Sequence, residues 1–263
     1  MDMLRNVARF VFTASDPRFQ DWILFKPYAV IFILFSYLYF VLVCGPRFMK
    51  NRKPYSLKTF IKFYNIFQIF LNGYMVYKFL RGCWYLKISI YCHPVSYDTS
   101  PEDMEIAVTS WLCLVSKIID LIETVIFILR KKDKQVSFLH LYHHVTTLTV
   151  GWIFGKHYSG GMAVIIPIVN CSVHVIMYTY YFASLLDGKI RDIVSKYKHW
   201  VTIIQMVQFV LLLVHNGQAF SPNCDVPNVI VFISCANYVI NFFLFYNFYK
   251  HAYLKKNIKY SQL

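Results

Sequence analysis

Seven apolar runs of about 20 residues, each bounded by charged or turn-forming residues, constrain this sequence more than any other feature. A helix of that length crosses the hydrocarbon core of a bilayer, where backbone polar groups must be satisfied within the helix itself. Only 15% of the residues are charged, against roughly a quarter in soluble domains. The sequence therefore predicts an all-α integral membrane protein with seven transmembrane helices. The predicted spans are 27–45, 60–81, 108–130, 137–155, 161–183, 199–215 and 228–249.

The segments between these spans are short, and the longest are the N-terminus and residues 82–107. The sequence contains no internal repeat and no low-complexity linker. These features predict a single polytopic membrane domain covering residues 1–263. Near the N-terminus, Arg5 and Arg9 flank only short apolar stretches, which favours a short interfacial helix over a cleaved signal peptide.

Basic residues gather in alternate loops, and this pattern predicts the orientation of the chain in the membrane. The loop 216–227 has no Lys or Arg. The positive-inside rule places the C-terminus in the cytosol and, with seven spans, the N-terminus in the lumen. The net charge of +14 is consistent with contact with anionic headgroups and with an anionic substrate. It does not indicate nucleic-acid binding, because the sequence shows no basic stripe on a soluble domain. The Lys and Arg residues that predict the cytosolic loops and tail are Arg47, Lys50, Arg52, Lys53, Lys58, Arg130, Lys131, Lys132, Lys134, Lys189, Arg191, Lys196, Lys198, Lys250, Lys255, Lys256 and Lys259.

This orientation puts three of the seven cysteines in lumenal loops, where disulfides persist. They are Cys83, Cys92 and Cys224. We predict a bridge between Cys92 and Cys224, which would tie the second loop to the sixth. Cys83, close to a membrane end, is the competing partner, and three free thiols are the remaining alternative.

Three histidines stand at the cytosolic start of the fourth predicted span, namely His140, His143 and His144. Positions i, i+3 and i+4 share one helix face, so the three imidazoles are expected to converge. Imidazole serves as a nucleophile, a general base, a hydrogen-bond donor or a metal ligand. One buried histidine is usually a satisfied core residue, but three at this spacing within apolar sequence indicate a reaction site.

The third predicted span carries four polar residues, Lys117, Asp120, Glu123 and Thr124. Lys117, Asp120 and Thr124 lie on one helix face. Polar groups inside a span mark function or internal pairing, so this group is expected to orient the imidazoles. The alternative is a self-neutralising Lys–Asp pair with a structural role alone.

The fifth and sixth spans add two further polar groups. Asn170 and His174 are one turn apart and suggest a pair that polarises a carbonyl or orients a base. Thr202, Gln205 and Gln208 recur in steps of three and form a second polar group that can belong to the site. The alternative is that these side chains only form hydrogen bonds between helices. We expect the four polar groups to form one chamber open to the cytosol, with apolar tunnel walls towards the lumen. Such a shape suits a substrate with a polar head and an apolar tail.

Taken in order and spacing, these motifs resemble those of the very-long-chain fatty acid elongases. The run QVSFLHLYHH at 135–144 is similar to the histidine box of that family. The runs NCSVHVIMYTYY at 170–181 and TIIQMVQ at 202–208 are similar to its second and third motifs. Tyr64-Asn65 and the run CHPV at 92–95 also resemble family positions. The resemblance covers residues 54–225.

Two features depart from the family pattern. The family usually has Lys-x-x-Glu-x-x-Asp-Thr, whereas this chain has Asp120 and Glu123 at the two acidic positions. Each carboxylate is thereby displaced by about one methylene, which alters the expected site geometry. In the C-terminal tail, Lys255, Lys256 and Lys259 lie too far upstream for a clean dilysine retrieval signal.

The resemblance implies an enzyme of the endoplasmic-reticulum membrane with six of its seven helices around an enclosed acyl tunnel. It implies a condensation of acyl-CoA with malonyl-CoA that gives 3-ketoacyl-CoA, CO2 and free CoA, with no cofactor. The ketoacyl reductase, dehydratase and enoyl reductase of the elongation cycle follow as partners from the pathway. A homodimer is compatible with the sequence, but no sequence signal establishes one.

The resemblance also suggests roles for the polar residues. His143 is expected to attack the acyl-CoA and form an acyl-imidazole, with His174 polarising the carbonyl or serving as the alternative attachment point. Asn170 is expected to stabilise oxyanion charge, and Asp120 or Glu123 to orient an imidazole. The residues expected to hold substrate are Lys117, Tyr178, Tyr181, Gln205 and Gln208.

Two other functions compete with this reading. A His-x-x-His-His box also occurs in membrane di-iron oxidases, but such enzymes need several boxes and the remaining histidines here are scattered. A seven-span receptor or channel fits the orientation, but it does not require four polar motifs in one chamber. We therefore expect no metal at the histidines.

Overall fold

The computed structural model describes residues 12, 16–222, 224, 226 and 228–254. This part of the chain is helical and contains no strand. The chain divides into two compact units, Met1–Leu57 with Lys78–Ile165 and Lys58–Tyr77 with Ile166–Leu263. The predicted N-terminal interfacial helix at Arg5 and Arg9 and the tail lysines 255–259 lie outside the described residues.

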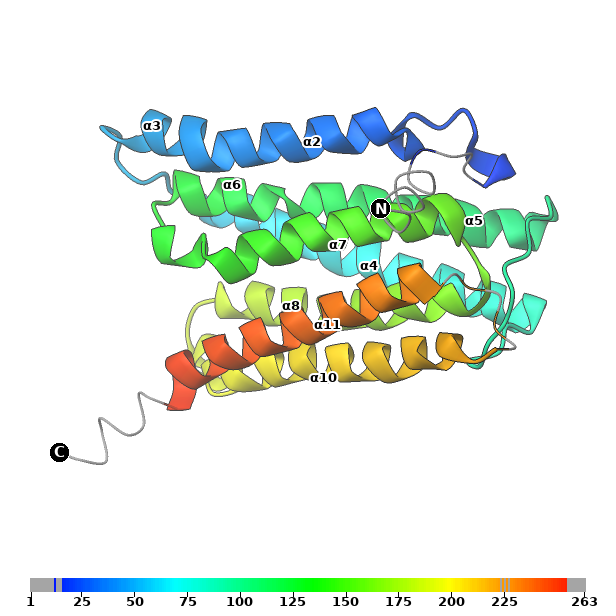
Figure 1. Cartoon of the computed structure of the whole chain (residues 1–263). Coiled ribbons are helices and arrows are strands. Elements are labelled where there is room, and N and C mark those ends of the chain that lie inside the picture. The colour runs from blue at the N-terminus through cyan, green and yellow to red at the C-terminus, as the bar shows by residue number, and fades with distance from the viewer. Residues whose placement is uncertain (1–11, 13–15, 223, 225, 227, 255–263) are drawn as a thin grey trace. The chain divides into compact units, whose positions relative to one another are not determined.

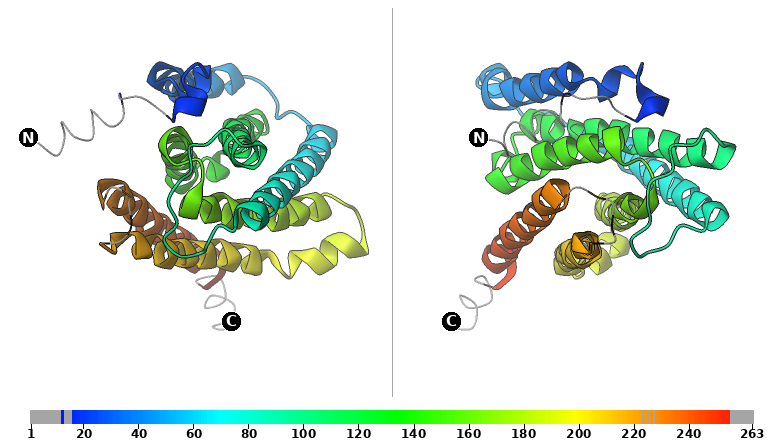
Figure 2. Two further views of the ribbon diagram at one scale, coloured as in Figure 1. Left: turned by 90° about the vertical axis from the view of Figure 1, so that its right-hand side faces the viewer. Right: turned by 45° about the vertical axis from the view of Figure 1, so that its right-hand side comes forward.

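The first unit is built around two long helices, α5 and α7, which run side by side (Figures 1 and 2). Helix α3 packs against α6, and α2 contacts α7. The elements of this unit are η1 (Pro17–Phe19), η2 (Ile23–Phe25), α2 (Pro27–Tyr39), η3 (Phe40–Cys44), α3 (Gly45–Met49), the last part of α4 (Lys58–Leu86), α5 (Pro101–Asp120), α6 (Ile122–Leu129), η4 (Asp133–Gln135), α7 (Phe138–His157) and η5 (Gly161–Val164).

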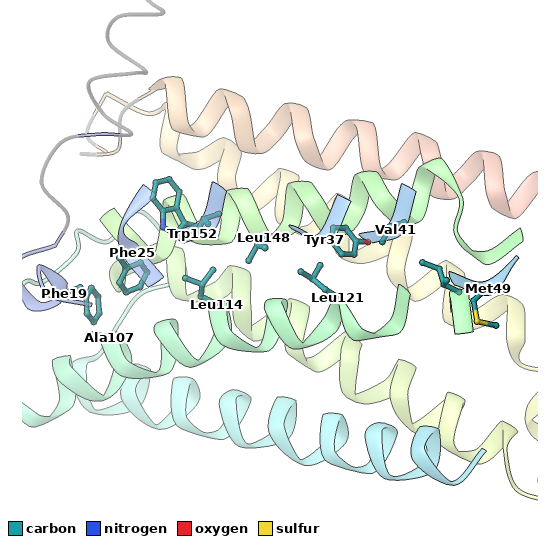
Figure 3. Packing of buried hydrophobic residues seen from close by; sticks show 12 residues of the cluster. Phe19, Phe25, Tyr37, Val41, Met49, Ala107, Leu114, Leu121, Leu148 and Trp152 are labelled. Atoms are coloured by element: carbon teal, nitrogen blue, oxygen red, sulfur yellow. The ribbon is translucent and has the colours of Figure 1, made fainter. Parts of the chain in front are cut away.

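An apolar core lies between these helices, and Figure 3 shows its side chains pointing towards one another. Phe19 and Phe25 come from the segment before α2, Leu114 from α5, and Leu148 and Trp152 from α7. Helix association in lipid depends on close van der Waals packing rather than on exclusion of water. This core therefore fixes the positions of α5 and α7, the helices that carry the first site residues.

The first predicted span extends further than expected. It was predicted to close at Pro46, but the helix continues to Met49 through a π-helical turn, η3. The backbone N–H of Gly45 donates to the carbonyl of Phe40, five residues back. A proline has no N–H and its ring clashes with the carbonyl four residues earlier, so a widened turn before Pro46 lets the helix pass through it.

The third predicted span, 108–130, is two helices in the structure. Helix α5 begins already at Pro101, because Ser100 caps it by accepting the backbone N–H of Asp103 at 3.1 Å. The helix is then interrupted at Leu121, whose N–H donates to Ile118 at 3.2 Å while Thr124 N–H donates back to Leu121 at 3.2 Å. These tighter three-residue bonds separate α5 from α6 beside the polar residues of this span.

A buried arginine holds the segment before α2 onto this unit. Arg18 makes a bidentate pair with Asp16, with N–O distances of 2.9 and 2.6 Å, and the two side chains are 2% and 0% exposed. The same guanidinium donates to the carbonyl oxygens of Asp103 and Ser159. Because an arginine presents several donors in a fixed fork, one side chain here satisfies acceptors from three segments.

We expect Arg18→Lys to lower the free energy of unfolding by about 1.5–3 kcal/mol, because an ammonium cannot reproduce the forked bonds. Arg81→Lys is the matched control, since Arg81 pairs with Glu105 at 2.7 Å but is 44% exposed. Thermal unfolding of the purified protein in detergent measures both. Equal melting temperatures for the two variants would refute a special role for Arg18.

In the second unit, α10 and α11 pack against each other (Figure 1), with the rings of Phe209 and Phe245 5.3 Å apart. The seventh predicted span, 228–249, coincides with α11. The elements of this unit are the first part of α4, α8 (Ile165–Ser184), α9 (Lys189–Ser195), α10 (Lys198–Gly217), η6 (Gln218–Phe220), α11 (Asn228–Tyr249) and η7 (Lys250–Leu254).

Within the described residues, four helical segments are long and apolar enough to cross a membrane. They correspond to the first, fifth, sixth and seventh predicted spans. The other three predicted spans are helical as well, in α4, in α5 with α6, and in α7. Buried polar residues such as Gln68, Lys117 and Asp120 interrupt the apolar sequence of α4 and α5. The seven-span count and the single domain stay predictions.

Candidate functional site

His140, His143 and His144, which belong to the first unit, occupy the first two turns of α7. Ser137 caps this helix, and its hydroxyl oxygen accepts the backbone N–H of His140 at 3.3 Å. The ring centroids of His140 and His144 are 4.3 Å apart, and those of His143 and His144 are 5.8 Å apart. The helix start thus brings three half-buried imidazoles together, as the i, i+3, i+4 spacing predicts.

A chain of hydroxyl groups leads from α2 to this histidine cluster. Thr124 Oγ1 lies 2.8 Å from His140 Nε2, and the phenol oxygen of Tyr37 lies 2.8 Å from Thr124 Oγ1. Sequence analysis missed Tyr37, because a tyrosine in a run of apolar and aromatic residues is indistinguishable from a core or lipid-facing residue. Only its position opposite Thr124 reveals it.

Asp120 and Glu123, the two carboxylates whose order differs from the family pattern, have different neighbours. Asp120 accepts a hydrogen bond from Lys117 Nζ at 2.9 Å, and these two side chains are 4% and 6% exposed. Glu123 Oε2 lies 3.8 Å from His144 Nε2. Glu123 therefore lies beside a histidine ring, while Asp120 pairs with a buried ammonium and also interacts electrostatically with His144.

Three side chains of this cluster also form a potential metal-binding group. The nearest ligand atoms of Glu123, His140 and His144 lie within 4.8 Å of one another. Two histidines and one glutamate form a common zinc donor set. His140 Nε2 is already hydrogen-bonded to Thr124, so a metal bound through that nitrogen would have to displace this bond.

The second unit has its own buried polar group around His174, on α8. The His174 ring meets the ring of Tyr178 edge-on at 5.7 Å, and Tyr178 in turn meets Tyr64 of α4 edge-on at 6.0 Å. Tyr181 lies 6.1 Å from Tyr178. Asn170, one turn before His174, is half-buried on the same helix. Tyr178 thus contacts His174 within α8, and Tyr64 of α4 contacts Tyr178 in turn.

A polar ladder along α4 supports this aromatic group. Gln68 Nε2 donates to the Tyr64 hydroxyl at 2.9 Å, and Asn72 Nδ2 donates to the Gln68 carbonyl at 2.8 Å. Gln68 and Asn72 are fully buried, and Tyr64 nearly so. Sequence analysis identified Tyr64 and its neighbour Asn65, but it overlooked the steps of four to Gln68 and Asn72 that signal one helix face.

We expect Tyr64→Phe to lower the free energy of unfolding by about 1 kcal/mol, because the Gln68 amide loses its acceptor inside the protein. Tyr77→Phe is the matched control on the same helix, since Tyr77 is 58% exposed. Thermal unfolding of the two variants in detergent compares them. A Tyr64→Phe melting temperature equal to that of the control would mean that the ladder carries no net stability.

The glutamines of the third motif lie on α10. Gln205 Nε2 contacts Met177 Sδ of α8 at 3.3 Å. Gln208 and Thr202 are buried, and Gln208 Oε1 has no hydrogen-bond partner within the described residues. A buried amide oxygen without a partner is costly, so this glutamine is a candidate to meet a polar ligand group or a water molecule.

The cysteines divide into two kinds. Cys92 and Cys224 are disulfide-bonded. Cys83, the competing partner, is not in a disulfide, and neither are Cys44, Cys113, Cys171 and Cys235. Near Cys92, the backbone N–H of Met162 donates to the carbonyl of His93 at 3.0 Å. Gly161 has a φ of 53° there and leaves no room for a Cβ beside that carbonyl.

Comparison with known proteins adds an independent finding. The sequence profile of the ELO family, described as the GNS1/SUR4 family, matches residues 22–261. The chain is 42% identical over 260 residues to human very long chain fatty acid elongase 1 and 40% identical over 259 residues to the mouse protein of that name. Each alignment covers 97% of this chain and 92% of the relative. Very long chain fatty acid elongase 7 of Drosophila melanogaster is 35% identical over 93% of this chain and 75% of its own length.

These matches extend over nearly the whole chain and include every motif described above. The chain belongs to the ELO family of very-long-chain fatty acid elongases. It is a multi-pass membrane enzyme of the condensing class, a 3-ketoacyl-CoA synthase.

Proposed function

We propose that this elongase joins a long-chain acyl-CoA to malonyl-CoA through an acyl-imidazole on His143. The observation that carries the proposal is the convergence of three imidazoles with the Glu123 carboxylate at the start of α7. No cysteine lies near these histidines in sequence, so an imidazole is the leading nucleophile. Chain length and unsaturation preference do not follow from these residues.

The reaction proceeds in two steps. A ring nitrogen of His143 attacks the thioester carbonyl, a C–N bond forms, the C–S bond breaks, and CoA leaves with the imidazole proton. Malonyl-CoA then loses CO2, and the electron pair of the broken bond forms an enolate. The enolate carbon attacks the acyl carbon, so a C–C bond forms, the C–N bond breaks, and the departing imidazole takes up a proton from water to replace the one lost to CoA. The product is 3-ketoacyl-CoA.

The surroundings of His143 support Nε2 as its reactive nitrogen. Thr147 Oγ1 lies 3.4 Å from Nδ1, one turn further along α7. A proton on Nδ1 directed at Thr147 leaves the lone pair on Nε2, and a lone pair is what nucleophilic attack requires. Glu123, beside His144, favours the positive charge that the acylated His143 ring carries until its proton leaves with CoA.

The remaining roles follow the same chemistry. His174 polarises a carbonyl or is the alternative attachment point, and Asn170 stabilises oxyanion charge. Lys117, paired with Asp120, supplies positive charge for the malonyl carboxylate or the CoA phosphates. The side chains proposed to hold the rest of the substrate are Tyr178, Tyr181, Gln205 and Gln208.

The cellular setting is part of the same proposal. The family implies the endoplasmic-reticulum membrane, seven spans, and six helices around an acyl tunnel. The basic loops support a cytosolic C-terminus and a lumenal N-terminus. The reductases and dehydratase of the elongation cycle would act on the product, and a homodimer remains compatible with the sequence.

A lumenal position for Cys92 and Cys224 fits their oxidised state, and we propose that they pair with each other. Digestion of the unreduced protein is expected to yield one cross-linked peptide containing both residues, which separates on reduction. Cys83 should be alkylated without reduction, as expected of a free thiol. A cross-linked peptide containing Cys83 would overturn the pairing.

A condensation assay with purified protein tests the proposed function. A panel of long-chain acyl-CoAs is incubated with labelled malonyl-CoA in the absence of NADPH, and 3-ketoacyl product and CO2 are measured. We expect both products in equal amounts. Folded protein that forms neither product with any acyl-CoA would contradict the proposal and direct attention to iron bound at Glu123, His140 and His144.

A further inference from the structure

The hydroxyl chain from Tyr37 to His140 carries a consequence for the protonation of that histidine. The Tyr37 phenol and the Thr124 hydroxyl each have one proton to donate. Within the described residues, Thr124 is the hydrogen-bond partner of the Tyr37 phenol, and His140 Nε2 is the other partner of Thr124. Tyr37 is 7% exposed and Thr124 is 0% exposed, so neither hydroxyl has ready access to water.

Only one arrangement uses both hydroxyl protons. Tyr37 donates to Thr124 Oγ1, and Thr124 donates to His140 Nε2. In the reverse direction, the Tyr37 proton has no acceptor, and an unmet buried donor costs about 1–3 kcal/mol. A histidine whose Nε2 accepts a hydrogen bond is the neutral tautomer with its proton on Nδ1, because a protonated Nε2 can only donate.

We propose that Tyr37 is a positioning residue that acts through Thr124 to hold His140 in the Nδ1–H tautomer. His140 then serves as an N–H donor towards a substrate oxygen and not as a nucleophile. Its Nδ1 has no hydrogen-bond partner among the described residues, which leaves that N–H available to a ligand. The assignment deepens the proposed function, since it gives neighbouring histidines of one box opposite roles.

The three residues come from different helices, which makes the geometry specific. Tyr37 lies in α2, Thr124 in α6 and His140 in α7. The Tyr37 ring belongs to the apolar core of the first unit, so the packing of that core fixes the position of its hydroxyl. A change in α2 is thereby transmitted to the histidine box through the two hydrogen bonds of Thr124.

The tautomer itself is the first test, and it needs neither substrate nor activity. Protein with ¹⁵N-labelled histidine is studied by NMR in detergent, and the His140 signal is assigned by its absence in His140→Asn. We expect a protonated Nδ1 and an unprotonated Nε2 in the native chain, and a tautomer mixture in Tyr37→Phe. A proton on Nε2 in the native chain, or a spectrum unchanged by Tyr37→Phe, would overturn the proposal.

Activity provides the second test. We expect Tyr37→Phe to lower kcat about tenfold with KM for acyl-CoA unchanged, and to have no further effect in a Thr124→Val background. Tyr39→Phe is the matched control, because Tyr39 is in the same helix and 51% exposed. Additive losses in the double variant would overturn the relay. If the native protein shows the expected tautomer but forms no product, the proposed reaction is contradicted and the tautomer assignment stands.

Discussion

Replacing His143 with alanine is expected to lower the condensation rate about 10³-fold, which is the loss expected when a catalytic nucleophile or base is removed. Alanine cannot form the acyl-imidazole, so transfer of the acyl group stops before malonyl-CoA is used. The measurement is the yield of 3-ketoacyl-CoA in the assay without NADPH. The loss should appear in kcat, because binding of the acyl chain does not depend on the imidazole.

Two controls make the His143→Ala result specific. His251→Ala removes an exposed histidine of η7 and should retain native activity. The melting temperature of His143→Ala should stay near that of the native chain, since His143 is only half-buried. Undiminished product from His143→Ala would keep the condensation but remove His143 as the nucleophile, and His174 would then be the next residue to replace.

Replacing Lys117 with methionine is expected to lower the free energy of unfolding by about 3–5 kcal/mol, because it leaves the buried Asp120 carboxylate without its ammonium partner. The two side chains are joined at 2.9 Å and are almost inaccessible to solvent. A carboxylate left alone in such surroundings must be protonated or draw water into the protein. Thermal unfolding in detergent measures the loss.

The double variant Lys117→Met with Asp120→Leu separates stability from function. Removing both charges should restore most of the stability, because the uncompensated charge is no longer there. Condensation should remain impaired if Lys117 also supplies charge to the substrate. Full recovery of activity together with stability would support the alternative reading, in which the pair is purely structural.

Sequence patterns predicted the apolar helices better than their ends. Predicted span seven, 228–249, coincides with α11, although the helical segment continues through the π-helical turn η7 to Leu254. Span one was predicted to stop at Pro46, and the error arose because a π-helical turn accommodates the proline. The break at Leu121 likewise has no proline or glycine to announce it. Such local adjustments follow from packing, which a single-sequence pattern does not contain.

The residues of the candidate site likewise divide into those that the sequence predicted and those that only the packing of helices reveals. The spacing of His140, His143 and His144 predicts their convergence, because it depends only on the geometry of one helix. The link from Tyr37 to Thr124 depends on how α2 packs beside α6, so no local pattern reveals it. The ladder of Gln68 and Asn72 was only partly predictable. Its steps of four are visible in the sequence, but they look the same as the i,i+4 side-chain pairs found along many helices.

The most direct test of the account is to look for the acyl-enzyme itself. Native protein is mixed with a long-chain acyl-CoA in the absence of malonyl-CoA, quenched rapidly and measured by intact-protein mass spectrometry, followed by peptide mapping. The account predicts a mass increase of one acyl group on the peptide that contains His143, and its disappearance when malonyl-CoA is added. An enzyme that condenses these substrates without any acylated histidine, or with the acyl group on His174, would contradict the central claim.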